Sequence, residues 1–281
     1  MLSAKALKTC LAAGVAVSLL ATAGCASNSR KEDLAYVERP VETIYSEATT
    51  SLDRGLWAQA ALQFDEVQRQ HPYSVWAQRA MLMASYARYR ARDYEKSITS
   101  AQEYISLHPG GDGAPYAYYL VAVCHFDQII DVGREQARSE LALAALNEVT
   151  ARFPESEYAR DAELKTDMVR DQLAGKEMEI GRYYLKRNEH LAAINRFKKV
   201  VKVYDTTTHV PEALHRLVES YLSIGLKGQA QAAAAVLGYN FPGSDWYADS
   251  YKLVTDAGLD LPQKPENEKG INWIARLKSM F

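Results

Sequence analysis

The sequence has few of the residues that cross-link or interrupt a polypeptide. It contains 3 cysteines, 15 glycines and 9 prolines among 281 residues. Two of the cysteines, Cys10 and Cys25, lie in the N-terminal segment, where we predict below that Cys10 is removed and Cys25 is lipidated. Cys124 then has no partner, which excludes a disulfide framework. The low glycine and proline counts argue against long disordered tracts. Stability must therefore come from the packing of apolar side chains.

The sequence also lacks a strong charge of one sign and the common catalytic motifs. Its formal net charge is −2, so we expect no nucleic-acid partner. It contains no glycine-rich phosphate loop, nucleophile elbow or HExxH zinc motif. Candidate metal ligands are His209, Glu212 and His215, but the two histidines are six residues apart and lie on different helix faces. We therefore expect a protein without enzymatic activity, metal or cofactor.

One apolar run, from Leu11 to Ala21, is the exception to an otherwise mixed sequence. It follows a short basic start and is too short to span a membrane comfortably. This arrangement is typical of a signal peptide, which predicts that residues 1–24 are removed.

The end of this segment resembles a bacterial lipoprotein signal, with Thr-Ala-Gly preceding Cys25. Thr22 departs from the pattern, because leucine is usual at that position. The resemblance implies lipidation of Cys25 and a tether over residues 25–42, whereas ordinary secretion is the alternative. Ala26 follows the cysteine in place of the aspartate that would resemble an inner-membrane retention signal, which points to the outer membrane.

A spacing of four, three and five residues recurs five times along the chain. The first member of each set is small, so a neighbouring helix can approach closely there. The sets are Ala60, Phe64, Val67 and Pro72; Ser97, Ala101, Tyr104 and Pro109; Ala142, Leu146, Val149 and Pro154; Ala193, Phe197, Val200 and Asp205; and Ala230, Ala234, Leu237 and Pro242. The first three positions share one helix face, and in four of the five sets proline then ends the helix. Repeats of this kind are typical of stacked helix pairs.

The repeats resemble the tetratricopeptide family, most clearly in the segments GLWAQAALQFDEV and RDYEKSITSAQEYI. We therefore predict an all-α, tetratricopeptide-like solenoid of about five helix pairs with a C-terminal capping helix. The predicted helices include those over 57–70, 94–107 and 245–257, and one long helix over 156–187.

Three regions follow from this prediction. About three N-terminal repeats occupy residues 43–155, and about two C-terminal repeats with the cap occupy residues 156–260. Residues 261–281 form a linker and an amphipathic tail, with Ile271, Ile274, Leu277 and Phe281 at helical spacing. This tail could dock on the solenoid, lie on a membrane surface or bind a partner.

Several strings resemble the BamD family of outer-membrane lipoproteins more specifically. They are HPYS at 71–74, RFPESEYA at 152–159 and YYLKRNEHLAAINR at 183–196. The resemblance implies a scaffold, lipid-anchored at the periplasmic face of the outer membrane, that belongs to the β-barrel assembly machinery. Such a scaffold helps to fold and insert outer-membrane proteins by binding the POTRA domains of BamA and unfolded client chains.

The resemblance also implies site residues. Arg196, together with Arg187 and Tyr184, would face the POTRA domains, and Arg196 would form a salt bridge with a POTRA carboxylate. Arginine suits this role because its planar guanidinium makes two-pronged bonds that lysine cannot make. The alternative is that Arg196 is an exposed helix charge that contributes little free energy to stability or binding.

The N-terminal repeats of the family are implicated in receiving client chains. Among 18 tyrosines, Tyr45, Tyr73, Tyr86 and Tyr89 could form an aromatic groove for an extended peptide, because rigid rings give contact area at low entropic cost. Packing between helices is the alternative for each of them. Two other functions stay open: a periplasmic scaffold for other envelope or pilus assembly, and a cell-wall enzyme adaptor or hydrolase that uses His125 or His215.

Overall fold

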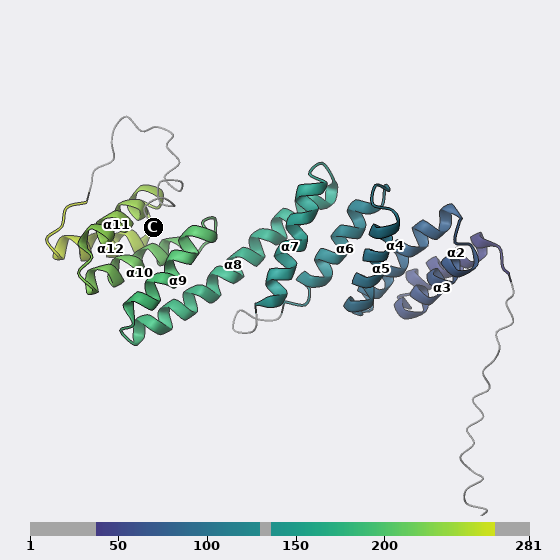
Figure 1. The fold of residues 1–281 in the computed structure, drawn as a ribbon, viewed down its shortest axis with the longest axis horizontal. Helices are drawn as coiled ribbons and strands as arrows, with labels where there is room; N and C mark the ends of the chain where they lie inside the picture. Colours follow the sequence, from purple (N-terminus) through teal and green to yellow (C-terminus); the bar gives the residue numbers. More distant parts are fainter. Residues whose placement is uncertain (1–37, 130–135, 262–281) are drawn as a thin grey trace, which may run out of the picture. The chain divides into compact units, whose positions relative to one another are not determined.

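In the computed structural model, residues 38–129 and 136–261 are described, and their regular structure is entirely α-helical (Figure 1). The helices are α2 (Val41–Asp53), α3 (Trp57–Gln70), α4 (Val75–Arg90), α5 (Tyr94–Leu107), α6 (Ala114–Phe126), α7 (Ala137–Arg152), α8 (Glu157–Lys186), α9 (His190–Val203), α10 (Val210–Ser223), α11 (Lys227–Asn240) and α12 (Asp245–Asp256). Contacts divide the chain after Pro40, and the description below concerns the unit that begins at Val41.

The helices form five consecutive pairs, α2/α3, α4/α5, α6/α7, α8/α9 and α10/α11. Each helix packs against the next along the chain, and neighbouring first helices of the pairs also touch from α2 through α8. Helix α12 contacts both α10 and α11 and covers the last pair. The predicted solenoid of five helix pairs with a capping helix is therefore confirmed.

The repeated spacing marks the core face of the second helix in every pair. All fifteen residues at the first three positions of the five sets are buried, with at most 3% of their surface exposed. Each second helix also ends in the same way, because the residue after it donates its backbone N–H to the carbonyl of the third position. These cap residues are His71, His108, Phe153, Tyr204 and Phe241.

A left-handed residue turns the chain between the helices of four pairs. Gly55 and Gly225 have φ values of 75° and 77°, as the absence of a side chain permits. Arg92 and Asn188 adopt the same conformation, with φ values of 60° and 59°. This conformation is sterically unfavourable for arginine but not for glycine. The turn geometry is therefore set by helix packing as well as by the backbone preference of the residue at the turn.

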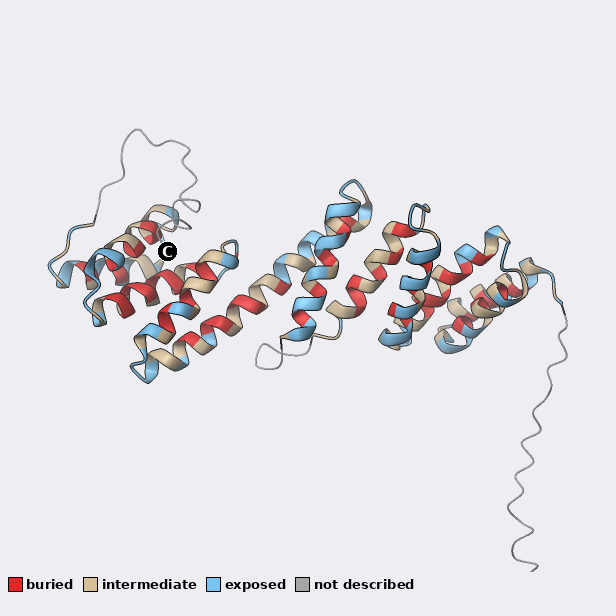
Figure 2. Ribbon diagram, in the orientation of Figure 1, coloured by how far each residue is buried: buried red, intermediate tan, exposed pale blue. Residues whose placement is uncertain are grey.

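The core is divided in the N-terminal repeats and continuous in the C-terminal repeats. Separate buried clusters lie around Phe64, around Tyr104 and around Leu120. One larger cluster then runs from Ala122 of α6 through α7, α8, α9, α10 and α11 to Val254 of α12. Figure 2 shows the buried residues as stripes along the inward faces of the helices.

Several predictions concern residues outside the described part of the chain. They are the signal peptide over 1–24, the lipidation of Cys25, most of the tether over 25–42, and the tail beyond Leu261. The loop at 130–135 is also outside the described residues. These predictions stay predictions.

Candidate functional site

A buried carboxylate with two cationic partners lies between α8 and α9. Glu177 of α8 accepts hydrogen bonds from Arg196 Nη1 at 3.1 Å and from Lys199 Nζ at 2.6 Å. The Glu177 side chain is only 3% exposed, whereas Arg196 and Lys199 are 40% and 42% exposed. The two helices meet closely because Gly181 leaves room for the ring of Phe197. We call Glu177, Arg196 and Lys199 the α8–α9 charge cluster.

The outer part of this cluster is positively charged. Helix α9 has the sequence HLAAINRFKKVVKV, which contains one arginine and three lysines and no acidic residue. The hydrogen bond to Glu177 raises the pKa of Lys199. Partial burial, with a smaller contribution from Lys202, lowers the pKa of Lys198. A helix with this charge suits a partner that presents carboxylates.

The other two residues predicted for the partner side lie at the C-terminal end of α8 and differ in exposure. Arg187 is bound within the chain, through Nε to Glu189 at 2.9 Å and through Nη1 to the Tyr183 hydroxyl at 3.1 Å. Tyr184 packs against the C-terminal core cluster, and its ring meets the edge of Tyr183. Tyr183, which is 56% exposed, therefore presents more surface than the predicted Tyr184. The sequence signal for both was the same paired-tyrosine motif.

The histidines considered for a metal make separate contacts. His209 Nε2 lies 3.6 Å from Asp171, while buried His215 bonds Ser250 Oγ through Nδ1 at 2.9 Å. Glu212 instead pairs with Arg182 at 2.9 Å. Within residues 38–129 and 136–261, no group of three or more histidine, cysteine or acidic side chains could hold a metal ion.

The structure does not bring the four predicted client tyrosines into one groove. Tyr45 packs between Phe64 and Trp76, with ring centroids 5.3 and 4.8 Å away. Tyr73 lies in the turn before α4 and is fully exposed. Only Tyr86 and Tyr89 share a cluster, which they form with residues of α6.

That cluster belongs to a larger half-buried tyrosine surface on α4, α6 and α8. Its members are Tyr86, Tyr89, Tyr116, Tyr119 and Tyr158, which we call the tyrosine band. The Tyr158 centroid lies 5.4 Å from that of Tyr116 and 5.2 Å from that of Tyr119. The hydroxyls of Tyr89 and Tyr119 donate to Asp127 and Asp161, respectively.

Sequence reasoning missed three members of the tyrosine band, although a signal was present. Tyr86 and Tyr89 are three residues apart, and Tyr116 and Tyr119 repeat that spacing in the next first helix. Burial is the main cause that raises the pKa of Tyr116 above its ordinary value. The Tyr116 phenol therefore stays neutral, and the band offers aromatic rings for binding.

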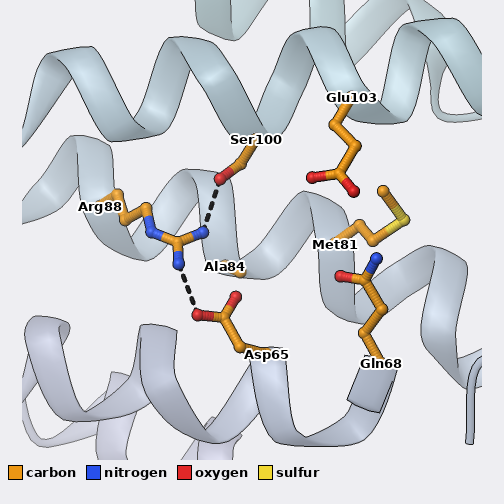
Figure 3. A pocket seen from close by; sticks show the side chains of 7 residues that line it. All are labelled: Asp65, Gln68, Met81, Ala84, Arg88, Ser100 and Glu103. Atoms are coloured by element: carbon orange, nitrogen blue, oxygen red, sulfur yellow. Dashed lines mark hydrogen bonds and ion pairs between the residues drawn. The ribbon is translucent and has the colours of Figure 1, made fainter.

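A pocket of about 270 Å³ lies on the N-terminal repeats between α3, α4 and α5. Figure 3 shows Arg88 reaching between Asp65 of α3 and Ser100 of α5. Gln68 and Glu103 extend from opposite walls, and Met81 lies beside them. Because Arg88 bonds both neighbouring helices, its chief effect is to tie the first pair to the second.

Comparisons with known proteins show the family of this chain. A family model described as YfiO, outer membrane lipoprotein, matches residues 37–237. The outer membrane protein assembly factor BamD of Caulobacter vibrioides is 56% identical over 237 residues, covering 84% of this chain and 78% of that protein. BamD of Rickettsia prowazekii is 42% identical over 235 residues, covering 84% and 92%. The chain belongs to the BamD family.

The matched range contains both the tyrosine band and the α8–α9 charge cluster of this BamD-family protein. The family match supports a role in outer-membrane protein assembly and an association with the outer membrane. Among the helices of the described residues, none combines the length and the hydropathy needed to cross a bilayer.

Proposed function

We propose that this chain is a non-catalytic scaffold that couples client capture to the barrel-forming partner BamA. The C-terminal repeats bind the POTRA domains of BamA, and the N-terminal repeats receive unfolded outer-membrane proteins. A lipid on Cys25 holds the chain at the periplasmic face of the outer membrane.

The observation that carries this proposal is the α8–α9 charge cluster. Arg196 bonds Glu177 through one nitrogen only, and its side chain is 40% exposed. The remaining N–H groups of the guanidinium can therefore meet a carboxylate of the POTRA domains in a two-pronged bond. Exposed Tyr183 and Arg187, which lie at the end of α8, extend the same contact.

The tyrosine band replaces the predicted groove as the client site. Its rings come from three neighbouring first helices, so one extended peptide can cross all three. Half-buried rings are already ordered, and ordering them on binding costs little entropy. Tyr86 and Tyr89 keep their predicted role, while Tyr45 serves the core and Tyr73 lies apart from the band.

Copurification tests the partner contact. The amount of BamA that copurifies from envelope extracts is compared for the natural chain and Arg196→Glu. Arg152→Glu on α7 is the control for reversing the charge of an exposed arginine. We expect BamA with the natural chain and the control but little with Arg196→Glu. Recovery with all three would remove Arg196 from the interface. Absence of BamA from every sample would leave only a repeat scaffold for other envelope assemblies.

Peptide binding tests the client site. A fluorescent peptide that ends in phenylalanine is titrated against the natural chain, Tyr116→Ala and the control Tyr251→Ala, whose tyrosine is exposed on α12. We expect Tyr116→Ala to weaken binding about 10-fold, because removal of one buried aromatic anchor costs about 1–2 kcal/mol of binding free energy. Equal affinities of all three proteins would contradict the proposed groove.

A further inference from the structure

The α8–α9 charge cluster contains one more cation than its buried acid needs. Glu177 is almost completely shielded from solvent, and it is bonded by both Arg196 and Lys199. A buried carboxylate requires a partner, because an unpaired buried charge is strongly destabilising. One cation meets that requirement, so the second remains available for another task.

The geometry distinguishes the two cations. Lys199 approaches Glu177 Oε1 at 2.6 Å, whereas Arg196 approaches Oε2 at 3.1 Å. Lysine is a compact point charge, and arginine presents several donors in a fixed plane. Among the described residues, Glu177 is the one hydrogen-bond partner of Arg196. The guanidinium is therefore held through one nitrogen, and the side chain stays 40% exposed.

We infer that Glu177 and Lys199 are positioning residues for Arg196. Glu177 fixes the direction of the guanidinium, and Lys199 neutralises Glu177 so that the charge of Arg196 stays available to a partner carboxylate. This inference rests on the proposed function, in which Arg196 meets the POTRA domains.

Removal of Lys199 distinguishes this arrangement from a simple basic patch. Without Lys199, Glu177 has Arg196 as its sole counter-ion and neutralises it. The partner carboxylate then meets a neutral ion pair. Removal of Glu177 as well restores the single positive charge of the cluster, because both an acid and a base are then absent.

A double-mutant cycle tests this coupling. The affinity of the full chain for full-length BamA, both in detergent, is measured for Lys199→Met, Glu177→Gln and the double variant. Lys202→Met is the matched control, because it removes a lysine from the same helix without a bond to Glu177. A parallel cycle combines Lys202→Met with Glu177→Gln.

We expect Lys199→Met to weaken binding about 5-fold, in line with a partly exposed charge interaction. Glutamine keeps an amide oxygen that can accept the hydrogen bond from Arg196, so Glu177→Gln removes the negative charge but retains the positioning bond. It should therefore change the affinity of the natural chain less than about 2-fold and should restore the affinity of Lys199→Met. It should have no such effect on Lys202→Met. This pattern would support the inference.

Equal effects of Glu177→Gln in the natural, Lys199→Met and Lys202→Met backgrounds would overturn the inference. Arg196→Ala separates its failure from that of the proposed function. If Arg196→Ala binds BamA as the natural chain does, the proposed contact itself is wrong. If Arg196→Ala binds weakly while the two cycles are additive, only the positioning role is wrong.

Discussion

Substitution of Gly181 by alanine should loosen the contact between α8 and α9. A Cβ atom at this position would lie 2.4, 2.8 and 2.9 Å from three ring atoms of Phe197. Real Cβ contacts essentially never fall below 3.0 Å. Phe197 is fully buried, so its ring cannot turn toward solvent to make room.

The expected magnitude follows from two opposing effects. Overpacking of a well-filled core costs about 1–3 kcal/mol, and contact with three atoms of a buried ring places Gly181→Ala near the upper end. Replacement of glycine by alanine within a helix contributes about 1 kcal/mol in the other direction. We therefore expect Gly181→Ala to reduce the local free energy of unfolding by about 2 kcal/mol.

Hydrogen exchange measured by mass spectrometry suits a repeat protein, whose units can open separately. Amides of α8 and α9 should lose protection in Gly181→Ala and recover part of it when Phe197→Leu is added. Gly228→Ala on α11 is the control, because a Cβ there meets nothing within 4 Å. Unchanged or increased protection of α8 and α9 in Gly181→Ala would refute the close-approach argument.

Three further predictions concern other parts of the fold. Burial opposes ionisation of Glu219, but bonds from His215 and Arg216 outweigh it and lower the pKa of the carboxyl. The ionised carboxylate therefore stabilises the fold above the ordinary glutamate pKa, and this contribution is lost as pH falls through the lowered value. Glu219→Gln should thus flatten the fall in melting temperature on acidification below about pH 4.5, and parallel curves for the two proteins would contradict this. Burial raises the pKa of Cys124 to about 11, so iodoacetamide at pH 8 should label it only after denaturation; rapid native labelling would show an accessible thiol. Arg92→Gly should raise stability by up to about 1 kcal/mol, because glycine accepts the left-handed turn, and a lowered melting temperature would count against it.

Much of the fold could be predicted from sequence because the core positions carry a local signal. The helices expected over 57–70 and 94–107 have those bounds in the structure, and the long helix expected over 156–187 spans 157–186. Small and large residues at fixed spacing define the buried face of each second helix, and a following proline marks the end of four of the five.

The candidate sites were harder to predict because they depend on contacts between distant residues. Arg196 could be chosen from a motif, but its bond to buried Glu177 joins residues on two helices. Nothing in the local sequence around Glu177 indicates that this carboxylate is buried. Tyr45 similarly resembles the tyrosines of α4 in sequence, yet it packs against Phe64 and Trp76.

The long helix α8 has a consequence for the spacing of the two proposed sites. Tyr158 lies in its first turn, and Glu177 lies in its C-terminal half. At about 1.5 Å per residue, the two positions are about 28 Å apart along one uninterrupted helix. The helix sets the separation of the two sites, because no hinge or linker lies between Tyr158 and Glu177. Under the proposed function, α8 would hold a client chain on the tyrosine band at a set distance from the partner at α9, and this distance would determine the effective concentration of one near the other.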